Sequence, residues 1–406
     1  MMKKYILTLA AVLITLTASA QQKLYLCFSN GYDTVEAEEI NVSYSDNTVT
    51  INGTSYDIST LDSISFSKPT NLSALTMVTI TYNGTSASVT VPSSISGVTY
   101  TVSGADVVIT STNTSDEITY EATGSSTNGS LIINGEYKLT LRLNGLDLTS
   151  TGVFAPINIK NGKRNALILV DGTINSLTDS ANDTISAPLH TKGHLEIDGL
   201  GTLNITGNHK HGISTKEYLQ IKSTAGTINI LSTVSDGIHA GQYFQMNGGT
   251  VNIANTGGDG IQAEVTDDTT DENNGEMIIK GGTINATMAE EDTKAMKADA
   301  DITISGGTIT LYANGNGSRG IQTDTNITIG EDDTTTTIYI EANGGLCTAE
   351  EDAEDPHRCM GMKADDTVTI NAGTITVKNN GTKSRGIRCG TYVKNGGTVS
   401  ATVKQG

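Results

Sequence analysis

The chain has 406 residues, of which 44 are glycine and 5 are proline, and its formal net charge is -19 at pH 7. This acidic balance argues against nucleic acid and anionic membrane surfaces as partners. Tryptophan is absent and aromatic residues make up only 4% of the chain, which suits thin repeated β elements with small core residues.

The first 20 residues have the features of an export signal. Lys3 and Lys4 precede an apolar run over 5–16, and an Ala-Ser-Ala motif at 18–20 provides a small-residue cleavage site. The run is too short for a membrane span. We therefore predict a signal peptide at 1–20 and a secreted protein, in the periplasm or outside the cell, with no membrane span. Cys27 lacks the small-residue context of a lipid-attachment cysteine.

Two smaller β regions are expected before the main repeat. Within 21–70, Asn52-Gly53 stands between two alternating segments, a pattern typical of a tight hairpin. Residues 71–135 contain further strands with turns at 83–84 and 103–104 but no regular period. We predict a small β-hairpin module at 21–70 and an irregular β cap at 71–135, which covers the otherwise unpaired edge of the first coil.

The remainder of the chain repeats one phrase. Gly-Thr followed by alternating apolar and polar residues recurs in segments such as 249–253 (GTVNI) and 282–286 (GTINA). Alternation with period two indicates half-buried strands, and repetition indicates stacked units. Three short strands fit in each repeat, separated by turns rich in Gly, Asn and Asp. The fold predicted for 136–406 is an all-β, right-handed parallel β-helix with three short strands per coil.

Aligning the repeats gives columns of residues that share one position on the coil. An apolar position filled by Ile, Leu or Met points into the core, so the residue after it and the one two places later point outward. The first outer column comprises His190, Ser214, His239, Gln262, Lys297, Gln322, Lys363 and Arg388. The second outer column comprises Lys192, Lys216, Gly241, Glu264, Asp299, Asp324, Asp365 and Gly390.

The two outer columns set basic and acidic side chains next to each other. One interpretation is a solvated ladder of ion pairs, with Lys297 beside Asp299 and Lys363 beside Asp365. The other is a ligand-binding face, which we favour because the insertions at 266–275, 288–293 and 343–358 all leave the coil at an edge of this strand. The residues expected to bind the ligand are His239, Lys297, Arg319, Lys363 and Arg388.

Acidic side chains also gather at one corner of the coil. Asp236 and Asp259 stand in Asp-Gly-Ile phrases one coil apart, and acidic residues recur at the corresponding corner of the next coil. Oxygen ligands grouped in this way suit calcium, whereas each aspartate alone is explained by an Asx turn. Carboxylates stacked at about 4.8 Å in the second outer column also repel one another unless a cation neutralises them. The expected calcium ligands are Asp236, Asp259, Glu291, Asp292, Glu264, Asp299, Asp324 and Asp365.

Four cysteines in an exported chain permit disulfides without dictating them. Cys347 and Cys359 bracket an acidic insertion, and a bridge between them would fix its base. Cys389 lies one coil further on, so a pairing of Cys359 with Cys389 is the alternative. Cys27 is expected to be free or buried.

The repeats from Leu139 onward resemble a known family. Segments 155–157 (API), 193–197 (GHLEI), 201–205 (GTLNI), 236–240 (DGIHA) and 259–263 (DGIQA) resemble the exported carbohydrate-binding β-helix proteins. That family binds plant cell-wall polysaccharide, carries calcium in its coils and is similar to the calcium-dependent pectate lyases of polysaccharide lyase family nine. The resemblance implies calcium ligands at Asp236 and Asp259, where Ile replaces the family's aromatic residue. It also implies that a lyase base would be Lys294, Lys297 or Lys363, with no surrounding motif to choose among them.

Aromatic content and charge narrow the expected ligand. Tyr218, Tyr243 and Phe244 are the residues that could stack locally on a neutral sugar, so the basic column together with calcium favours an acidic glycan. A carboxylate beside a lysine favours the ammonium form, which opposes a role as base. We predict a secreted calcium-binding β-helix that binds an acidic, pectin-like polysaccharide containing uronate units, without cleaving it. The alternatives are a calcium-dependent pectate-type lyase with a lysine base and a structural surface stalk or adhesin.

Overall fold

The computed structural model describes residues 22–28, 31–37, 40–45, 48–57, 61–65 and 76–405, apart from 183, 269, 332–334 and 348–355. The predicted signal peptide at 1–20 and the acidic insertion at 348–355 lie outside the described residues. The chain divides into two compact units, residues 1–78 with 91–96 and residues 79–90 with 97–406. Within the described ranges, no helix is long and apolar enough to cross a membrane.

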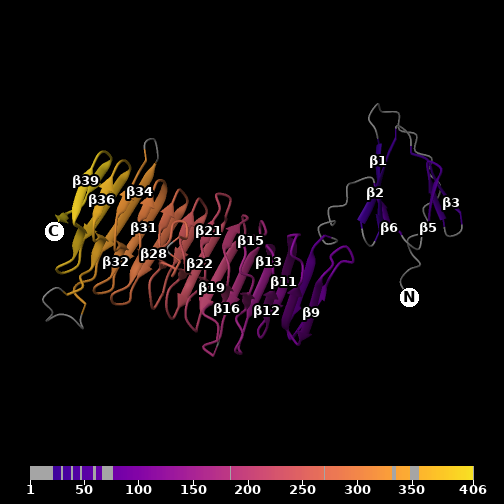
Figure 1. Cartoon of the computed structure of the whole chain (residues 1–406), viewed down its shortest axis with the longest axis horizontal. Coiled ribbons are helices and arrows are strands. Elements are labelled where there is room, and N and C mark those ends of the chain that lie inside the picture. The colour runs from indigo at the N-terminus through magenta and orange to yellow at the C-terminus, as the bar shows by residue number, and fades with distance from the viewer. Residues whose placement is uncertain are drawn as a thin grey trace. The chain divides into compact units, whose positions relative to one another are not determined.

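The N-terminal unit contains two small antiparallel sheets (Figure 1). One is formed by β1 (Gln22–Phe28), β2 (Gly31–Ala37) and β6 (Leu61–Ser65), and the other by β3 (Val42–Ser45), β4 (Thr48–Ile51) and β5 (Thr54–Asp57). Leu24 and Leu26 of one sheet share a core cluster with Val49 and Ile51 of the other. The hairpin predicted at Asn52-Gly53 is confirmed, because both residues have the positive φ values, 46° and 86°, that a tight β4–β5 turn requires.

The second unit begins with antiparallel strands that lead into parallel ones. A hairpin joins β7 (Val78–Asn83) to β8 (Ser86–Thr90), and β9 (Val98–Ser103) pairs antiparallel with β10 (Asp106–Ser111). Parallel pairing already begins between β10 and β12 (Ser130–Asn134), and between β11 (Ile118–Ser126) and β13 (Leu139–Thr149). The expectation of an irregular cap as far as 135 was therefore wrong, because the first coils use alternating strands without the Gly-Thr phrase.

The rest of the unit is a parallel β-helix with three strands in each coil, as predicted (Figure 1). The first ladder continues from β12 through β14 (Ile157–Ile159), β17 (Leu189–Thr191), β20 (Ile213–Thr215), β23 (Ile238–Ala240), β26 (Ile261–Ala263), β29 (Lys294–Ala298), β32 (Arg319–Thr323), β35 (Met360–Ala364), β38 (Arg385–Cys389) and β41 (Val403–Gln405). Each strand pairs with the strand of the same position in the next coil, so the backbone hydrogen bonds run along the stack.

The other two ladders start from β13, whose first half pairs with β15 and whose second half pairs with β16. The second ladder comprises β15 (Asn165–Leu169), β18 (Leu195–Asp198), β21 (Leu219–Ile221), β24 (Phe244–Met246), β27 (Met277–Ile279), β30 (Ile302–Ile304), β33 (Ile327–Ile329), β36 (Thr367–Ile370) and β39 (Thr391–Lys394). The third comprises β16 (Ile174–Thr178), β19 (Thr202–Gly207), β22 (Thr227–Thr233), β25 (Thr250–Ile253), β28 (Thr283–Met288), β31 (Gly307–Ala313), β34 (Thr336–Ala342), β37 (Thr374–Asn379) and β40 (Thr398–Ser400).

The predicted inward column of the first ladder is confirmed. Its members pair in register from coil to coil, and each is 0% exposed. They are Leu189, Ile213, Ile238, Ile261, Met296, Ile321, Met362 and Ile387. Burying an aliphatic side chain of this size contributes about 1.5–3 kcal/mol, so a continuous column holds the coils in one alignment.

Glycine has two separate uses in the coil. The glycine before the inward residue lets adjacent coils approach, since a Cβ on Gly237 would lie 2.6 Å from the carbonyl oxygen of Gly260. The glycine that opens the third-ladder strand serves the turn instead, as at Gly282, whose φ is +92°. The Gly-Ile and Gly-Thr parts of the repeated phrase therefore have different physical causes.

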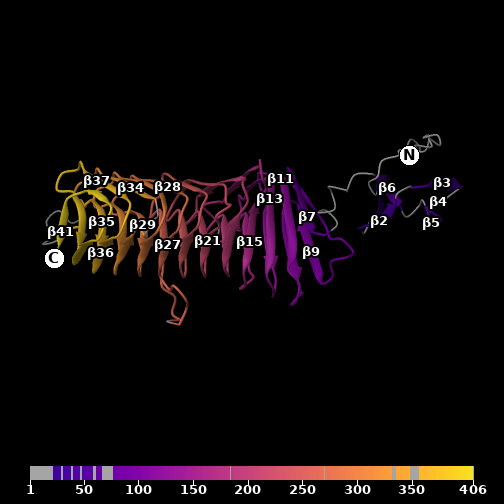
Figure 2. The ribbon, with the colours of Figure 1, turned by 90° about the horizontal axis from the view of Figure 1, so that it is seen from above.

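One insertion forms a loop that is closed at its own base. The loop between β26 and β27 projects from the stack of coils (Figure 2). At its base, the backbone N–H of Thr266 donates to Asn274 Oδ1 at 2.7 Å, and Asn274 Nδ2 donates to the Thr266 carbonyl oxygen at 3.3 Å. The preceding coil also holds the loop, because Gln242 Nε2 donates to the carbonyl oxygen of Glu272 at 2.8 Å. The strands β26 and β27 keep their places in the ladders.

Neither of the two disulfides that the sequence permits is formed by Cys359. Cys359 and Cys389 are buried free thiols, so Cys359 is bonded neither to Cys347 nor to Cys389. Burial raises the pKa of the Cys359 thiol to about 11, and its Sγ contacts the carbonyl oxygen of Ala313 at 3.2 Å. These thiols are core groups of the coil. Cys27 lies in β1, and its side chain is outside the described part of the structure.

Candidate functional site

The first outer column lies in register along the first ladder, as the alignment of repeats predicts. Consecutive members pair from His190 to Arg388 without a break. Lys404 extends the column by one more coil, since it pairs with Arg388. Lys404 was not predicted to belong to the column because its strand lacks the preceding glycine, although Val403-Lys404 repeats the apolar-basic order. Three basic side chains, of Lys363, Arg388 and Lys404, therefore follow one another at the C-terminal end of the column.

The first outer column is only partly open to solvent. Ser214, Gln262 and Gln322 are buried, and the side chains of Lys297 and Lys363 are 26% and 17% exposed. The aliphatic stems of the lysines thus pack against their neighbours while the amines reach the surface. This arrangement restricts the rotamers of the basic groups before any ligand binds.

The second outer column has its carboxylates nearer to solvent. The side chains of Glu264 and Asp365 are 43% and 51% exposed. Lys363 Nζ lies 2.7 Å from Asp365 Oδ1, as predicted. The predicted pairing of Lys297 with Asp299 is wrong, because Asp299 Oδ2 accepts the backbone N–H of Val265 at 3.2 Å. Lys297 Nζ instead lies 3.9 Å from the Oδ2 atom of Asp259.

Asp236 and Asp259 lie on the same side of adjacent coils and are linked through the backbone. Asp236 Oδ1 accepts the N–H of Asp259 at 2.9 Å, and Asp259 Oδ1 accepts the N–H of Lys294 at 2.8 Å. Both aspartates are buried, at 6% and 8% exposure. Burial raises the pKa of Asp259. The corner is therefore a chain of turn-capping carboxylates whose Oδ1 atoms are already used.

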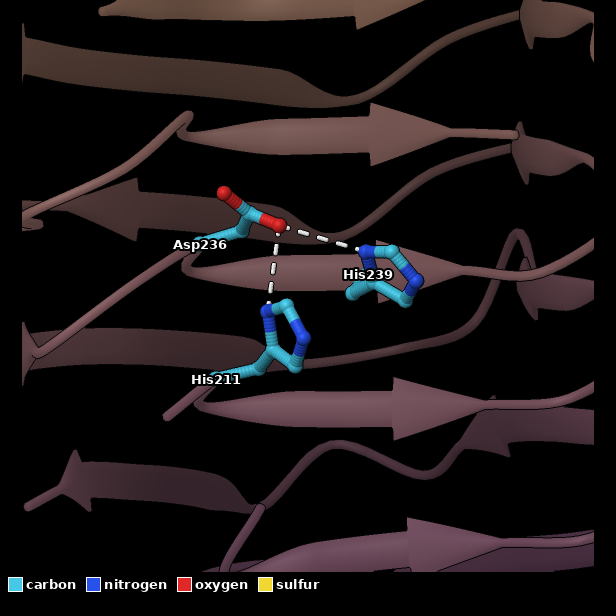
Figure 3. Close-up of side chains that lie close together, drawn as sticks. All are labelled: His211, Asp236 and His239. Carbon is cyan, nitrogen blue, oxygen red and sulfur yellow. Dashed lines mark hydrogen bonds and ion pairs between the residues drawn. The ribbon is translucent and has the colours of Figure 1, made fainter. Parts of the chain in front are cut away.

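The second oxygen of Asp236 faces two imidazole rings (Figure 3). Asp236 Oδ2 lies 3.0 Å from His211 Nδ1 and 3.2 Å from His239 Nδ1. Among the residues that the structure describes, these three form a group whose potential ligand atoms all lie within 4.8 Å of one another. His211 was missed by the sequence analysis, although it occupies in His211-Gly212-Ile213 the position that Asp236 occupies one coil later.

Burial and the neighbouring imidazoles shift the pKa of Asp236 in opposite directions. Burial alone would raise the pKa of Asp236, but the adjacent imidazoles of His211 and His239 and the N–H of Asp259 lower it overall. Burial is also the largest influence on His211, and it lowers the pKa of that imidazole. Asp236 is accordingly a buried carboxylate that stays charged at neutral pH beside a neutral His211.

The potential metal ligands around Asp236 and those of the second outer column suit different cations. Calcium takes oxygen ligands, whereas two imidazole nitrogens with one carboxylate oxygen suit zinc and related ions. Asp236 therefore lacks the all-oxygen surroundings that calcium takes, whereas the second oxygen of Asp259 lies 3.9 Å from Lys297 Nζ. Glu264, Asp299, Asp324 and Asp365 present oxygen only, on consecutive coils, and they fit calcium by donor type.

The remaining predicted residues gather around Asp292 at the edge of the first ladder. Lys294 Nζ lies 3.4 Å from Asp292 Oδ2, and His357 Nδ1 lies 3.1 Å from Asp292 Oδ1. Arg319 is 3% exposed, and its Nη1 atom donates to Gln322 Oε1 at 2.5 Å. The expectation that Arg319 contacts the ligand was wrong, because its guanidinium is inside the coil edge. Glu291 is exposed next to this group.

Two of the three aromatic residues expected to stack on a sugar, Tyr218 and Phe244, are not available for it. The ring of Tyr218 stacks on His194 at a centroid distance of 4.3 Å and on Tyr243 at 4.8 Å, so its two faces are covered. Phe244 is a core residue at 0% exposure. The rings stack because His194, Tyr218 and Tyr243 lie at the same position of successive coils. The stack stabilises the turn before the second-ladder strands.

A different surface follows the third ladder. Asparagine amides there bond from coil to coil, at 2.9 Å between Asn229 and Asn204, 2.8 Å between Asn252 and Asn229, and 2.9 Å between Asn285 and Asn252. We call Asn204, Asn229, Asn252 and Asn285 the amide ladder. Its last three members line a shallow groove of about 370 Å³ together with Leu231 and Tyr312. The repeated Asn in the Gly-Thr phrase was the sequence signal for it.

Comparison with known proteins agrees with this architecture. Residues 103–405 match the family described as carbohydrate-binding domain-containing protein. The chain belongs to this family. The chain is also similar to a solved structure of a polysaccharide lyase-like protein from C. thermocellum, a gadolinium derivative, with 22% identity over 64% of this chain and 99% of that one and a TM-score of 0.53. That similarity concerns the fold of the family's β-helix. No curated protein matches the chain.

Proposed function

We propose that the chain is a secreted protein that binds an acidic, uronate-containing polysaccharide such as pectin, and that it does so without cleaving the polymer. Membership of the carbohydrate-binding family supports a polysaccharide as the partner. The single observation that carries the acidic specificity is the in-register set of Lys297, Lys363 and Arg388 on the first ladder. A polymer that lies along the stack meets these three basic groups on the same side of the β-helix, within a run of four coils in which Gln322 takes the remaining place.

Calcium is the proposed cofactor of this binding. The acidic side chains of the second outer column stand beside the basic ones, and they would repel the carboxylates of a uronate chain. A calcium ion accepts six to eight oxygen ligands in flexible geometry, so protein and sugar carboxylates can share it. Glu264, Asp299, Asp324 and Asp365 would hold the ion together with the ligand.

The lysines named as bases in the lyase alternative are engaged with carboxylates. Lys294 lies near Asp292, Lys297 near Asp259 and Lys363 near Asp365. Opposite charges in contact stabilise each other, and proton abstraction from a sugar needs a free amine. These contacts count against a role as base for the three lysines.

The test is a binding measurement on polygalacturonate by calorimetry, with calcium and with excess chelator. We expect binding that falls at least about 10-fold on chelation and no rise in the absorbance of unsaturated uronides. A rise in that absorbance would identify a lyase. Equal failure to bind polygalacturonate and neutral glucans would identify a structural stalk.

A further inference from the structure

The cluster of His211, Asp236 and His239 has the geometry of a metal site with nitrogen ligands, unlike the all-oxygen site proposed for calcium. The rings of His211 and His239 stack at a centroid distance of 4.3 Å and an angle of 23°, so both Nδ1 atoms project to the same side, toward Asp236 (Figure 3). They lie 3.0 and 3.2 Å from one oxygen of that carboxylate. Ligands that share one tetrahedral zinc ion, at about 2.0–2.2 Å each, lie roughly 3.3 Å apart.

The surroundings of the two rings are compatible with a cation between them and Asp236. His239 Nδ1 is hydrogen-bonded to Asp236 Oδ2 at 3.2 Å, a contact that a shared metal ion would replace. The other ring nitrogen of His239, Nε2, lies 3.4 Å from Glu264 Oε2. His211 Nδ1 is buried and has no hydrogen-bond partner of acceptable geometry, although the oxygen of Asp236 is close. A buried nitrogen aimed at a carboxylate without a hydrogen bond is costly unless a positive charge lies between them.

We propose that His211, Asp236 and His239 bind one first-row divalent transition-metal ion, with zinc as the reference ion. Two imidazole nitrogens and one carboxylate oxygen are a donor set that such ions prefer to calcium. Glu264 would orient His239 from behind, as carboxylates do for many metal-bound histidines. His211 precedes β20, Asp236 precedes β23 and His239 lies within β23, so the ion ties two adjacent coils of the first ladder together.

Zinc titration of the untagged, metal-stripped protein by calorimetry tests this site. We expect one zinc ion per chain, retained in the presence of a large excess of calcium. His239→Gln should weaken zinc binding at least about 100-fold, and Glu264→Gln about 10- to 100-fold because it removes only the orienting carboxylate. His209→Gln is the matched control, since His209 lies outside the cluster, and it should bind zinc like the parent.

Cobalt provides a second readout that does not depend on affinity. Cobalt added to the parent should give the visible absorption bands of a four-coordinate site, and these should disappear in His239→Gln while far-ultraviolet circular dichroism is unchanged. Absence of stoichiometric zinc binding to the folded parent would overturn the proposal. Zinc binding of undiminished affinity in both His239→Gln and Glu264→Gln would overturn it as well.

Discussion

The first outer column and the amide ladder are built by the same repetition but behave in opposite ways. Asparagine is both donor and acceptor, so Asn204 to Asn285 satisfy one another from coil to coil at 2.8–2.9 Å. Like charges cannot do this, and along the first ladder Lys297 and Lys363 each lie beside a carboxylate. A repeated neutral amide satisfies its own hydrogen bonds along the stack. A repeated charge is instead repelled by its copies on neighbouring coils unless counter-ions or a charged ligand neutralise it.

The largest difference between the two surfaces should appear on charge reversal. Lys363→Glu combined with Arg388→Glu should lower affinity for polygalacturonate about 1,000-fold, near 4 kcal/mol, because two attractive contacts become repulsive. Lys378→Glu with Lys394→Glu changes the net charge equally on the other two ladders and should leave affinity within a factor of about three. Calorimetry on both double variants measures this, and equal losses would mean that net charge alone governs binding.

Acid should destabilise the β-helix through a half-buried histidine of the first ladder. Burial, reinforced by Lys216 and His211, lowers the pKa of His190 to about 4 from about 6.5 in the unfolded chain. The neutral form is favoured in the folded state, so stability is complete above pH 6.5 and falls by about 3 kcal/mol as the pH drops from 6.5 to 4. Urea unfolding across this range should show a shallower pH slope in His190→Gln. An identical slope in that variant would assign the loss to other groups.

Close approach of the coils beneath the first ladder is tested by Gly237→Ala. The new Cβ would lie 2.6 Å from the Gly260 carbonyl oxygen, so the two coils must move apart. We expect the unfolding free energy to fall by about 2 kcal/mol. Gly162→Ala is the control, because a Cβ there meets nothing within 4 Å. The denaturant midpoint of Gly237→Ala should be clearly lower than that of Gly162→Ala. Equal midpoints would show that adjacent coils can move apart at no cost in stability.

The smallest effect is expected in the amide ladder. Asn252→Ala removes the side-chain bonds to Asn229 and Asn285, and water in the groove replaces part of them, so stability should fall by only about 1 kcal/mol. Affinity for polygalacturonate should be unchanged, since this surface is on another ladder. A large loss of affinity in Asn252→Ala would move the glycan to the groove.

Register was the part of the structure that the sequence predicted best. Period-two alternation with a fixed glycine before each Ile leaves one alignment of coils, and the pairing from Leu189 to Ile387 follows it. The onset of the helix was predicted too late, since β10 and β12 stack in parallel without the Gly-Thr phrase. Hydrophobic alternation was the informative signal there.

Individual side-chain partners were harder to predict than columns. The residue before the glycine turns its side chain over the strand, as the contacts of Asp236 with His239 and of Arg319 with Gln322 show. Aligning the repeats places these residues in separate columns. For this reason His211 was not predicted as a site residue, and Asp299 rather than Asp259 was considered as the partner of Lys297. Such contacts depend on backbone geometry at the strand entrance, which residue spacing does not specify.

The loop at 266–275 is closed where Thr266 and Asn274 meet, and Gln242 of the preceding coil holds its far side through Glu272. Inserting residues between these contacts should leave the strand pairs of the β-helix in place, because the contacts on both sides of the insertion are kept. A segment added there would stand at one fixed coil along the stack.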